Sequence, residues 1–211
     1  MATMKLALYW AASCGGCEIS VLEIGEKILD LVSVADIVFW PAALDFKYGD
    51  VVKMPDKSVD LCLFNGAIRT TENEHMARLL RAKSKILVAF GSCAVEGCVP
   101  GLANLYTGGD ILRRIYRETP TTDNPSGIMP QAKTSVPEGD IDLPEFYNEV
   151  NTLAHTVDVD YFIPGCPPVG DQVWNALQTL VGGNLPPKGS TLGASEKQLC
   201  DECERKREEK K

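Results

Sequence analysis

Five short apolar runs, separated by stretches of helical pattern, constrain the fold of this chain more than any other feature. The middle runs are almost continuously apolar, which is typical of strands in a parallel sheet that helices cover on both faces. The runs are residues 5–11, 35–40, 59–65, 85–90 and 157–163. Helical patterns occupy residues 18–32, 71–83 and 171–181. This alternation predicts right-handed βαβ units in an α/β, doubly wound parallel sheet.

Two stretches depart from the alternation. Residues 119–144 contain several prolines and glycines in a mostly polar sequence, and a loop this long is uncommon inside a compact domain. We interpret it as a surface excursion that leans on a partner or on the functional site. After Gly182 the composition shifts to Gly, Pro, Ser and charged residues. This shift predicts a core domain over residues 1–182 and an irregular C-terminal tail over residues 183–211.

The charge of the chain argues against two classes of partner. A net charge of −8 would repel nucleic acid and an anionic membrane surface. The sequence shows no export signal at its start, and no apolar run approaches the ~20 residues of a membrane helix. We therefore expect a cytoplasmic protein. In a reducing compartment its eight cysteines are expected to be metal ligands or core thiols and not disulfides.

Four cysteines, at three places in the chain, each follow a predicted strand. Cys14 and Cys17 flank two glycines directly before a helical pattern, Cys93 lies in a Gly-Ser-Cys-Ala sequence, and Cys166 lies in Pro-Gly-Cys-Pro-Pro. Because the carboxyl ends of parallel strands meet at one edge of a sheet, these four thiols are expected to converge there. The glycines leave room for a bulky inorganic group, and a helix N-terminus favours thiolates. Four thiolates suit an iron–sulfur cluster or a structural zinc ion.

The residues alone leave a cluster, zinc and redox thiols open as alternatives. Structural zinc usually takes two closely spaced cysteine pairs, whereas here one pair joins two single cysteines, which favours a cluster. Cys62 lies inside an apolar run and is interpreted as a small core residue. Cys98 is a weaker candidate ligand, because four better placed thiols already fill a cluster. Cys200 and Cys203 form a second C-x-x-C pair, which needs further ligands to hold a second cluster or stays metal-free.

Three motifs in order resemble the small subunit of NiFe hydrogenases. They are C-G-G-C-E opening a helix, G-S-C-A-x-x-G after a strand and P-G-C-P-P before the last helix. The likeness, from about residue 4 to residue 180, is to cytoplasmic enzymes of the F420-non-reducing (methyl-viologen-reducing) type, which partner heterodisulfide reductase. It implies a flavodoxin-like domain in which Cys14, Cys17, Cys93 and Cys166 bind a proximal 4Fe–4S cluster. It also implies a separate large subunit that contains the NiFe centre.

The resemblance has three departures. The related cluster subunit of respiratory complex I usually has two adjacent cysteines at the first motif, so the spaced Cys14 and Cys17 favour a hydrogenase. Relatives have a longer C-terminal segment with cysteines for further clusters, and this sequence stops just after Cys203, so at most the start of that segment is expected. Some oxygen-tolerant hydrogenases resemble this chain in having a cysteine at the position of Cys98. They also have one where Gly16 stands, so tolerance by that route is not expected.

The resulting hypothesis is a subunit that transfers electrons and makes no bonds itself. Electrons from H2 would pass from the large subunit through the cluster to a further iron–sulfur or flavin subunit, such as one linked to heterodisulfide reductase. Glu18, beside Cys17, is a candidate proton relay, and the alternative is that it stabilises a helix N-terminus. The rival hypotheses are a complex I-like cluster subunit, a flavin-binding module of the same architecture and a zinc-binding scaffold.

Overall fold

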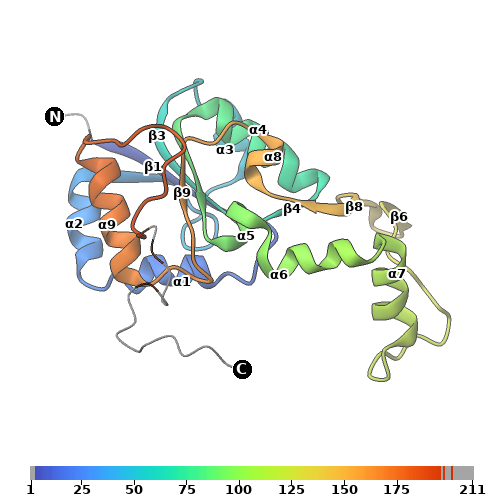
Figure 1. The fold of residues 1–211 in the computed structure, drawn as a ribbon. Helices are drawn as coiled ribbons and strands as arrows, with labels where there is room; N and C mark the ends of the chain where they lie inside the picture. The colour runs from blue at the N-terminus through green and yellow to red at the C-terminus, as the bar shows by residue number, and fades with distance from the viewer. Residues whose placement is uncertain (1–2, 196, 198–200, 202–211) are drawn as a thin grey trace, which may run out of the picture.

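The computed structural model describes residues 3–195, 197 and 201, and a five-stranded parallel sheet forms its centre (Figure 1). The strand order is β2-β1-β3-β5-β9, which is the order of flavodoxin-like sheets when these strands are counted along the chain. The strands are β1 (Met4–Trp10), β2 (Ala35–Phe39), β3 (Val59–Asn65), β5 (Ser84–Phe90) and β9 (Tyr161–Ile163). All neighbouring pairs run parallel. The predicted α/β class and doubly wound parallel sheet are therefore confirmed.

Helices cover both faces of this sheet because successive strand residues point to opposite sides. On β1, Leu6 and Leu8 belong to one buried core and Ala7 and Tyr9 to the other. The first core includes residues of α1 (Gly16–Leu22), α2 (Lys27–Val34) and α9 (Gly170–Val181). The second includes residues of α3 (Tyr48–Lys53), α4 (Thr71–Lys83), α5 (Ser92–Glu96) and α8 (Leu153–Thr156). The runs of apolar residues in β3 and β5 follow from this double burial.

Helix α4 matches its predicted bounds because the sequence supplies a complete N-terminal cap. The Thr70 hydroxyl accepts a hydrogen bond from the Asn73 backbone N–H at 3.3 Å, and the Asn73 side-chain oxygen accepts one from the Thr70 N–H at 3.2 Å. The two bonds satisfy backbone donors that a helix start otherwise leaves unpaired.

The single helix predicted over residues 18–32 is wrong. The structure has two helices there, α1 and α2, joined by a turn in which Gly25 adopts a positive φ of 66°. The Gly25 N–H donates to the Leu22 carbonyl at 3.1 Å and so ends the first helix. Glycine takes this left-handed conformation without strain, and the apolar pattern continues across the break because both helices pack on the same core.

The segment 119–144, interpreted above as a long loop that forms a surface excursion, contains a hairpin. Strands β6 (Lys133–Val136) and β7 (Gly139–Asp142) pair antiparallel. They belong to an extension that projects from the sheet at the right of Figure 1 and that also contains α7 (Gly108–Arg113) and a π-helical turn, η2 (Arg114–Glu118). Its link to the body includes α6 (Cys98–Gly101), η1 (Leu102–Leu105) and the antiparallel pair β4 (Ile68–Thr70) and β8 (Phe146–Asn151). Strands β6 and β7 are short and mostly exposed, so they show no hydrophobic periodicity in the sequence.

Residues after Gly182 continue to contact the sheet. The backbone N–H of Leu192 donates to the Phe162 carbonyl at 2.8 Å, and the Phe162 N–H donates to the Ser190 carbonyl at 3.1 Å. Leu192 is buried in the first core. The chain therefore packs along β9 beyond the predicted boundary, and the division at residue 182 stays a prediction. Within the described residues, no helix is long and apolar enough to cross a membrane.

Candidate iron–sulfur site

Three loops at the carboxyl edge of the sheet carry the four motif cysteines. Cys14 and Cys17 follow β1, and Cys17 lies in the first turn of α1. Cys93 lies in α5 directly after β5, and Cys166 follows β9. Because β5 and β9 are neighbours in the sheet, two of the loops start side by side. The sheet topology thus accounts for the approach of residues that are far apart in the sequence.

Backbone hydrogen bonds join the loops after β5 and β9. The Gly91 N–H donates to the Ile163 carbonyl at 2.7 Å, and the Ser92 N–H donates to the Gly165 carbonyl at 2.8 Å. In return, the Gly165 N–H donates to the Ser92 hydroxyl at 3.2 Å. These bonds fix Cys93 and Cys166 on two segments that are held against each other.

The loop after β1 meets both of these segments through glycines. A Cβ added to Gly91 would lie 2.2 Å from the Cys17 sulfur, so only glycine allows that thiol to lie against the end of β5. A Cβ at Gly16 would lie 3.5 Å from both the Cys14 sulfur and the Pro167 ring. The first loop therefore contacts the ends of β5 and β9 at the points where the other motif cysteines stand.

The four thiols differ in exposure, and two of them are strongly perturbed. Cys17 and Cys93 are buried, whereas Cys14 and Cys166 are exposed. Burial, followed by repulsion from Cys93 and Cys14, raises the pKa of Cys17 to about 12. Burial, followed by repulsion from Cys98 and Cys166, raises the pKa of Cys93 to about 11. The thiols are therefore close enough to disfavour one another's ionisation.

This donor set fits a cationic metal group. The charged neighbours that raise the pKa values of Cys17 and Cys93 all repel a thiolate, so positive charge is what would stabilise the deprotonated form. In the described part of the chain, no three His, Cys, Asp or Glu side chains converge tightly enough to hold a single metal ion.

Cys98, which follows Cys93 closely in the sequence, lies near this site. It is half-buried and adopts a positive φ of 44°, which is rare for a residue with a side chain. A hydrogen bond with Cys98, followed by its charge, raises the pKa of Cys166, and the charge of Cys98 also acts on Cys93. Whether Cys98 is a ligand stays a prediction.

The remaining cysteines lie elsewhere. Cys62 is fully buried in β3, in the second core, as predicted for a core residue. Cys200 and Cys203, the candidates for a second site, lie outside the described residues.

Glu18 is buried beneath the thiols and held by two partners that the sequence did not indicate. Its carboxylate accepts a hydrogen bond from the Trp40 indole N–H and one from the Asn65 side-chain amide at 3.2 Å. Trp40 follows β2 and Asn65 ends β3, so Glu18 ties α1 to two further strand ends. Burial raises the pKa of this carboxyl group, although both hydrogen bonds act to lower it. The sequence shows that an acidic residue follows Cys17, but it does not indicate that this residue is buried or which side chains bind it.

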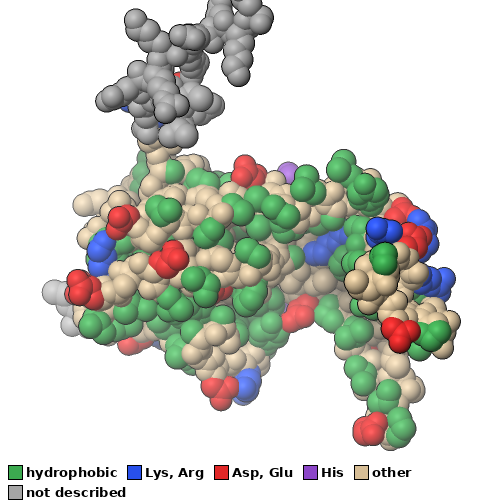
Figure 2. Space-filling model, turned by 90° about the horizontal axis from the view of Figure 1, so that it is seen from below, with side chains coloured by type: hydrophobic (Ala, Val, Ile, Leu, Met, Phe, Trp, Pro, Cys, Tyr) green, Lys and Arg blue, Asp and Glu red, His purple; other side chains and the backbone are tan. Residues whose placement is uncertain are grey.

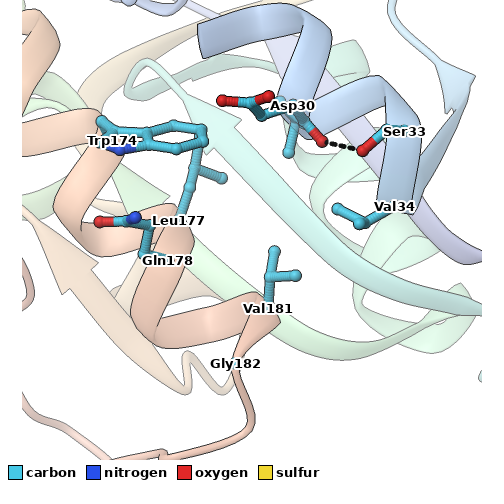
Figure 3. Close-up of a pocket in the computed structure, with 9 residues that line it drawn as sticks. Asp30, Ser33, Val34, Trp174, Leu177, Gln178, Val181 and Gly182 are labelled. Carbon is cyan, nitrogen blue, oxygen red and sulfur yellow. Dashed lines mark hydrogen bonds between the residues drawn. The ribbon is translucent and has the colours of Figure 1, made fainter.

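A groove between α2 and α9, with a volume of about 370 Å³, lies apart from the thiols (Figure 3). In Figure 3, side chains of α9, such as Trp174 and Leu177, face α2 residues Asp30 and Val34 across it. No cysteine lines this groove. It is a gap between two surface helices and brings no metal-binding groups together.

Comparison with known proteins connects these residues to redox enzymes. The model of the family "NADH ubiquinone oxidoreductase, 20 Kd subunit" matches residues 14–180, which include all four motif cysteines. The chain is 41% identical over 203 residues to the iron-sulfur subunit of the F420-non-reducing hydrogenase of Archaeoglobus profundus, covering 96% of the chain. It is 31% identical over 180 residues to the NAD-reducing hydrogenase HoxS subunit delta of Cupriavidus necator, covering 85% of the chain. It spans 63% of the first relative's length and 79% of the second's.

A solved structure shares the architecture. The chain aligns with a chain from the crystal structure of an NAD+-reducing NiFe hydrogenase in the H2-reduced state, with a TM-score of 0.75 and 28% identity. The alignment covers 88% of this chain and 94% of that one. The likeness therefore covers most of this chain and nearly all of that one.

Proposed function

Because this chain belongs to the NADH ubiquinone oxidoreductase 20 Kd subunit family and is similar to hydrogenase subunits over nearly its whole length, we propose that it is the electron-transfer small subunit of a NiFe hydrogenase. In this proposal Cys14, Cys17, Cys93 and Cys166 hold a proximal 4Fe–4S cluster. Such a cluster, when bound, accepts and passes on single electrons. The chain itself makes no bonds in the substrate.

The convergence of four thiols from three loops is the observation that carries this proposal. Structural zinc usually takes two closely spaced cysteine pairs, whereas here one pair, Cys14 and Cys17, joins two single cysteines from other loops. In a 4Fe–4S cluster each thiolate binds its own iron. The arrangement of the four cysteines in three loops thus favours a cluster over the zinc alternative. The relatives named as hydrogenase subunits likewise favour this function over a flavin-binding module.

The exposed part of the site supports a partner that covers it. Cys14 and Cys166 are exposed, and large apolar side chains stand open on the neighbouring α6–η1 segment. Val99, Leu102, Leu105 and Tyr106 are each more than 60% exposed. Figure 2, which looks onto this edge, shows hydrophobic side chains spread over the face. Apolar surface of this kind marks interaction sites, and we assign it to the large subunit that contains the NiFe centre.

The same proposal includes a proton relay, an electron acceptor and a cellular compartment. Glu18, buried between Cys17 and the strand ends, relays protons beside the cluster. Electrons leave to a further iron–sulfur or flavin subunit, such as one linked to heterodisulfide reductase. The complex works in the cytoplasm, where a reducing environment keeps cysteines available as metal ligands or core thiols.

The proposal is tested by purifying the tagged chain anaerobically from its native host. We expect a nickel-containing subunit to elute with it, and we expect the preparation to reduce methyl viologen with H2. A stable complex that contains no nickel and leaves the dye oxidised under H2 would contradict the assignment.

A further inference from the structure

A cavity of about 850 Å³ lies between the carboxyl edge of the sheet and the extension. Ala11 and Ala12, which follow β1, line one side of it, and Leu112, Tyr116 and Leu143 of the extension line the other. Figure 2 shows the surface hollowed between the body and the extension, with a basic side chain inside the hollow. None of the four motif cysteines lines this cavity, so it is separate from the thiol site.

Arg69 of β4 lines the cavity with a guanidinium group that lacks a counterion. The residue is 6% exposed. Its Nη1 donates to the Asn148 carbonyl at 3.4 Å, and its Nη2 is buried with no hydrogen-bond partner among the described residues. No carboxylate of the described chain forms an ion pair with it. A buried, unpaired cation is costly, and burial accordingly lowers the pKa of Arg69.

The local fold leaves part of this guanidinium without a partner. The pairing of β4 with β8 is irregular at Arg69, since Ile68 faces Asn151 while Thr70 already faces Phe146. The Phe146 ring stacks on the guanidinium, with its centroid 4.0 Å from the central carbon. Stacking occupies the face of the planar group and does not use its in-plane donors, of which Nη1 donates to Asn148 and Nη2 has no partner among the described residues. The in-plane donors of a guanidinium match the two oxygens of one carboxylate.

Other residues that line the cavity indicate which kind of anion it can bind. Thr70 and Asn73, at the N-terminus of α4, line the cavity. Their backbone N–H groups are used in the cap, so the helix contributes the positive end of its dipole, which favours an anion. Glu72 and Glu145 also line the cavity, and they repel a multiply charged anion such as phosphate more strongly than a singly charged one. The apolar wall suits an uncharged body.

We propose that this cavity binds a singly charged carboxylate carried on an apolar body, with the carboxylate held by Arg69. The carboxylate comes either from a free organic acid or from a polypeptide partner that covers this edge. The inference does not depend on the identity of the group held by the cysteines.

The test uses benzoate as the probe and benzyl alcohol as its uncharged match. Binding is titrated by ligand-observed NMR on the full chain and on the complex in which it is purified. We expect benzoate to bind the full chain at least about tenfold more tightly than benzyl alcohol does, because a bond to a charged group is lost in the alcohol. Equal binding of the two probes, or binding of neither, would overturn the proposal without any variant being needed.

Substitutions locate the site and identify the source of the carboxylate. Arg69→Met should lower benzoate affinity about tenfold or more, and Arg69→Lys should retain part of it, because lysine keeps the charge and loses the bidentate geometry. Iron content should be unchanged in both variants, so a failure here is distinguishable from a failure of the cluster assignment. Benzoate binding to the complex as well as to the chain indicates a free acid, whereas binding to the chain alone indicates a partner's carboxylate. Wild-type affinity in a folded Arg69→Met variant would refute the role of Arg69.

Discussion

At the amino edge of the central sheet acidic and basic side chains pair with one another, whereas at the carboxyl edge thiols meet neighbours that repel their charged form. Arg81 pairs with Asp160 at 2.5 Å and Lys85 pairs with Asp60 at 2.6 Å, both at the starts of strands. At the other edge, repulsion among cysteines follows burial as the cause of raised thiol pKa values. The charges at the amino edge are neutralised within the chain, whereas ionised thiols at the carboxyl edge would need positive charge from a bound group.

This difference separates the residues that hold the fold from those that perform the function. Charges at the amino edge are paired locally, so their removal should lower stability and leave the metal site intact. The charged groups that act on the Cys17 and Cys93 thiols all disfavour their ionised form, and neutral thiols form no ion pair that holds the fold. Their removal should therefore abolish metal binding with a smaller effect on folding.

Replacing a proposed ligand should abolish the cluster. Cys17→Ala removes a buried thiol in contact with the end of β5, and we expect iron bound per chain to fall close to zero. Cys62→Ala is the matched control, because it removes an equally buried cysteine from the core and should leave iron content unchanged. Full iron content in Cys17→Ala, measured after anaerobic purification, would contradict the assignment of Cys17 as a metal ligand.

Removing a charge at the amino edge should destabilise the protein without loss of iron. Arg81→Met leaves the mostly buried Asp160 with only its bonds to the Leu87 N–H and to Lys188. We expect unfolding in denaturant to cost about 2 kcal/mol less than in the wild type. The control is Arg78→Met on the same helix, whose exposed pair with Glu74 should contribute at most ~0.5 kcal/mol. Equal losses in the two variants would show that burial of the Arg81 pair has no special weight.

The difference in stability between the wild type and Arg81→Met should depend on pH, because Arg81 pairs with Asp160. Burial acts to raise its pKa, but the hydrogen bonds from Arg81 and the Leu87 N–H more than offset this and lower it. The folded state therefore holds the ionised form, and its contribution is present above the ordinary pKa of an aspartate and is lost as the pH falls through the lowered value. Stability of the wild type should fall more steeply below about pH 4 than that of Arg81→Met. Parallel curves would contradict the assignment.

At high pH the core thiol Cys62 should weaken the fold. Burial, only partly opposed by the neighbouring Ser84 and Arg81, raises its pKa from 9.0 to about 12. The unfolded chain loses this proton first, so stability falls as the pH rises from about 9 towards 12. By pH 10 the loss attributable to Cys62 should be about 1.4 kcal/mol, and Cys62→Ala should show that much less of a decline. Identical declines in both proteins would show that Cys62 is not the titrating group.

The smallest effect is expected for Glu18. Glu18→Gln keeps the size of the buried side chain and its acceptor oxygen for Trp40 or Asn65, so the spectrum of the cluster should be preserved. If Glu18 relays protons, H2 turnover by the complex should slow severalfold. Unchanged turnover would leave Glu18 with a structural role, as a tie between α1 and the ends of β2 and β3.

Much of the fold was predictable because it rests on double burial and local capping. The continuous apolar runs of β3 and β5 and the Thr70–Asn73 cap of α4 are signals that the sequence carries in full. The break at Gly25 was missed, because both helices turn the same apolar face to one core and the pattern runs through the turn. The hairpin β6–β7 was missed because its strands are short and mostly exposed.

The sequence identifies the candidate residues of the site, but it predicts only part of how they are arranged in space. Cysteines after strands of a parallel sheet are expected to meet at one edge, and the structure brings their loops together there. Their assignment as ligands stays a prediction. The contacts of Glu18 with Trp40 and Asn65, and the approach of Cys98 to Cys166, depend on tertiary packing between distant segments. No local pattern encodes them.

Iron and acid-labile sulfide content, with EPR spectroscopy of the dithionite-reduced protein after anaerobic purification, determines which group the carboxyl-edge thiols hold. We expect about four iron and four sulfide per chain, with the signal of a reduced 4Fe–4S cluster. Clearly more iron would indicate that Cys200 and Cys203 belong to a second cluster. Zinc in place of iron, or no metal at all, would contradict the assignment of these thiols to a cluster.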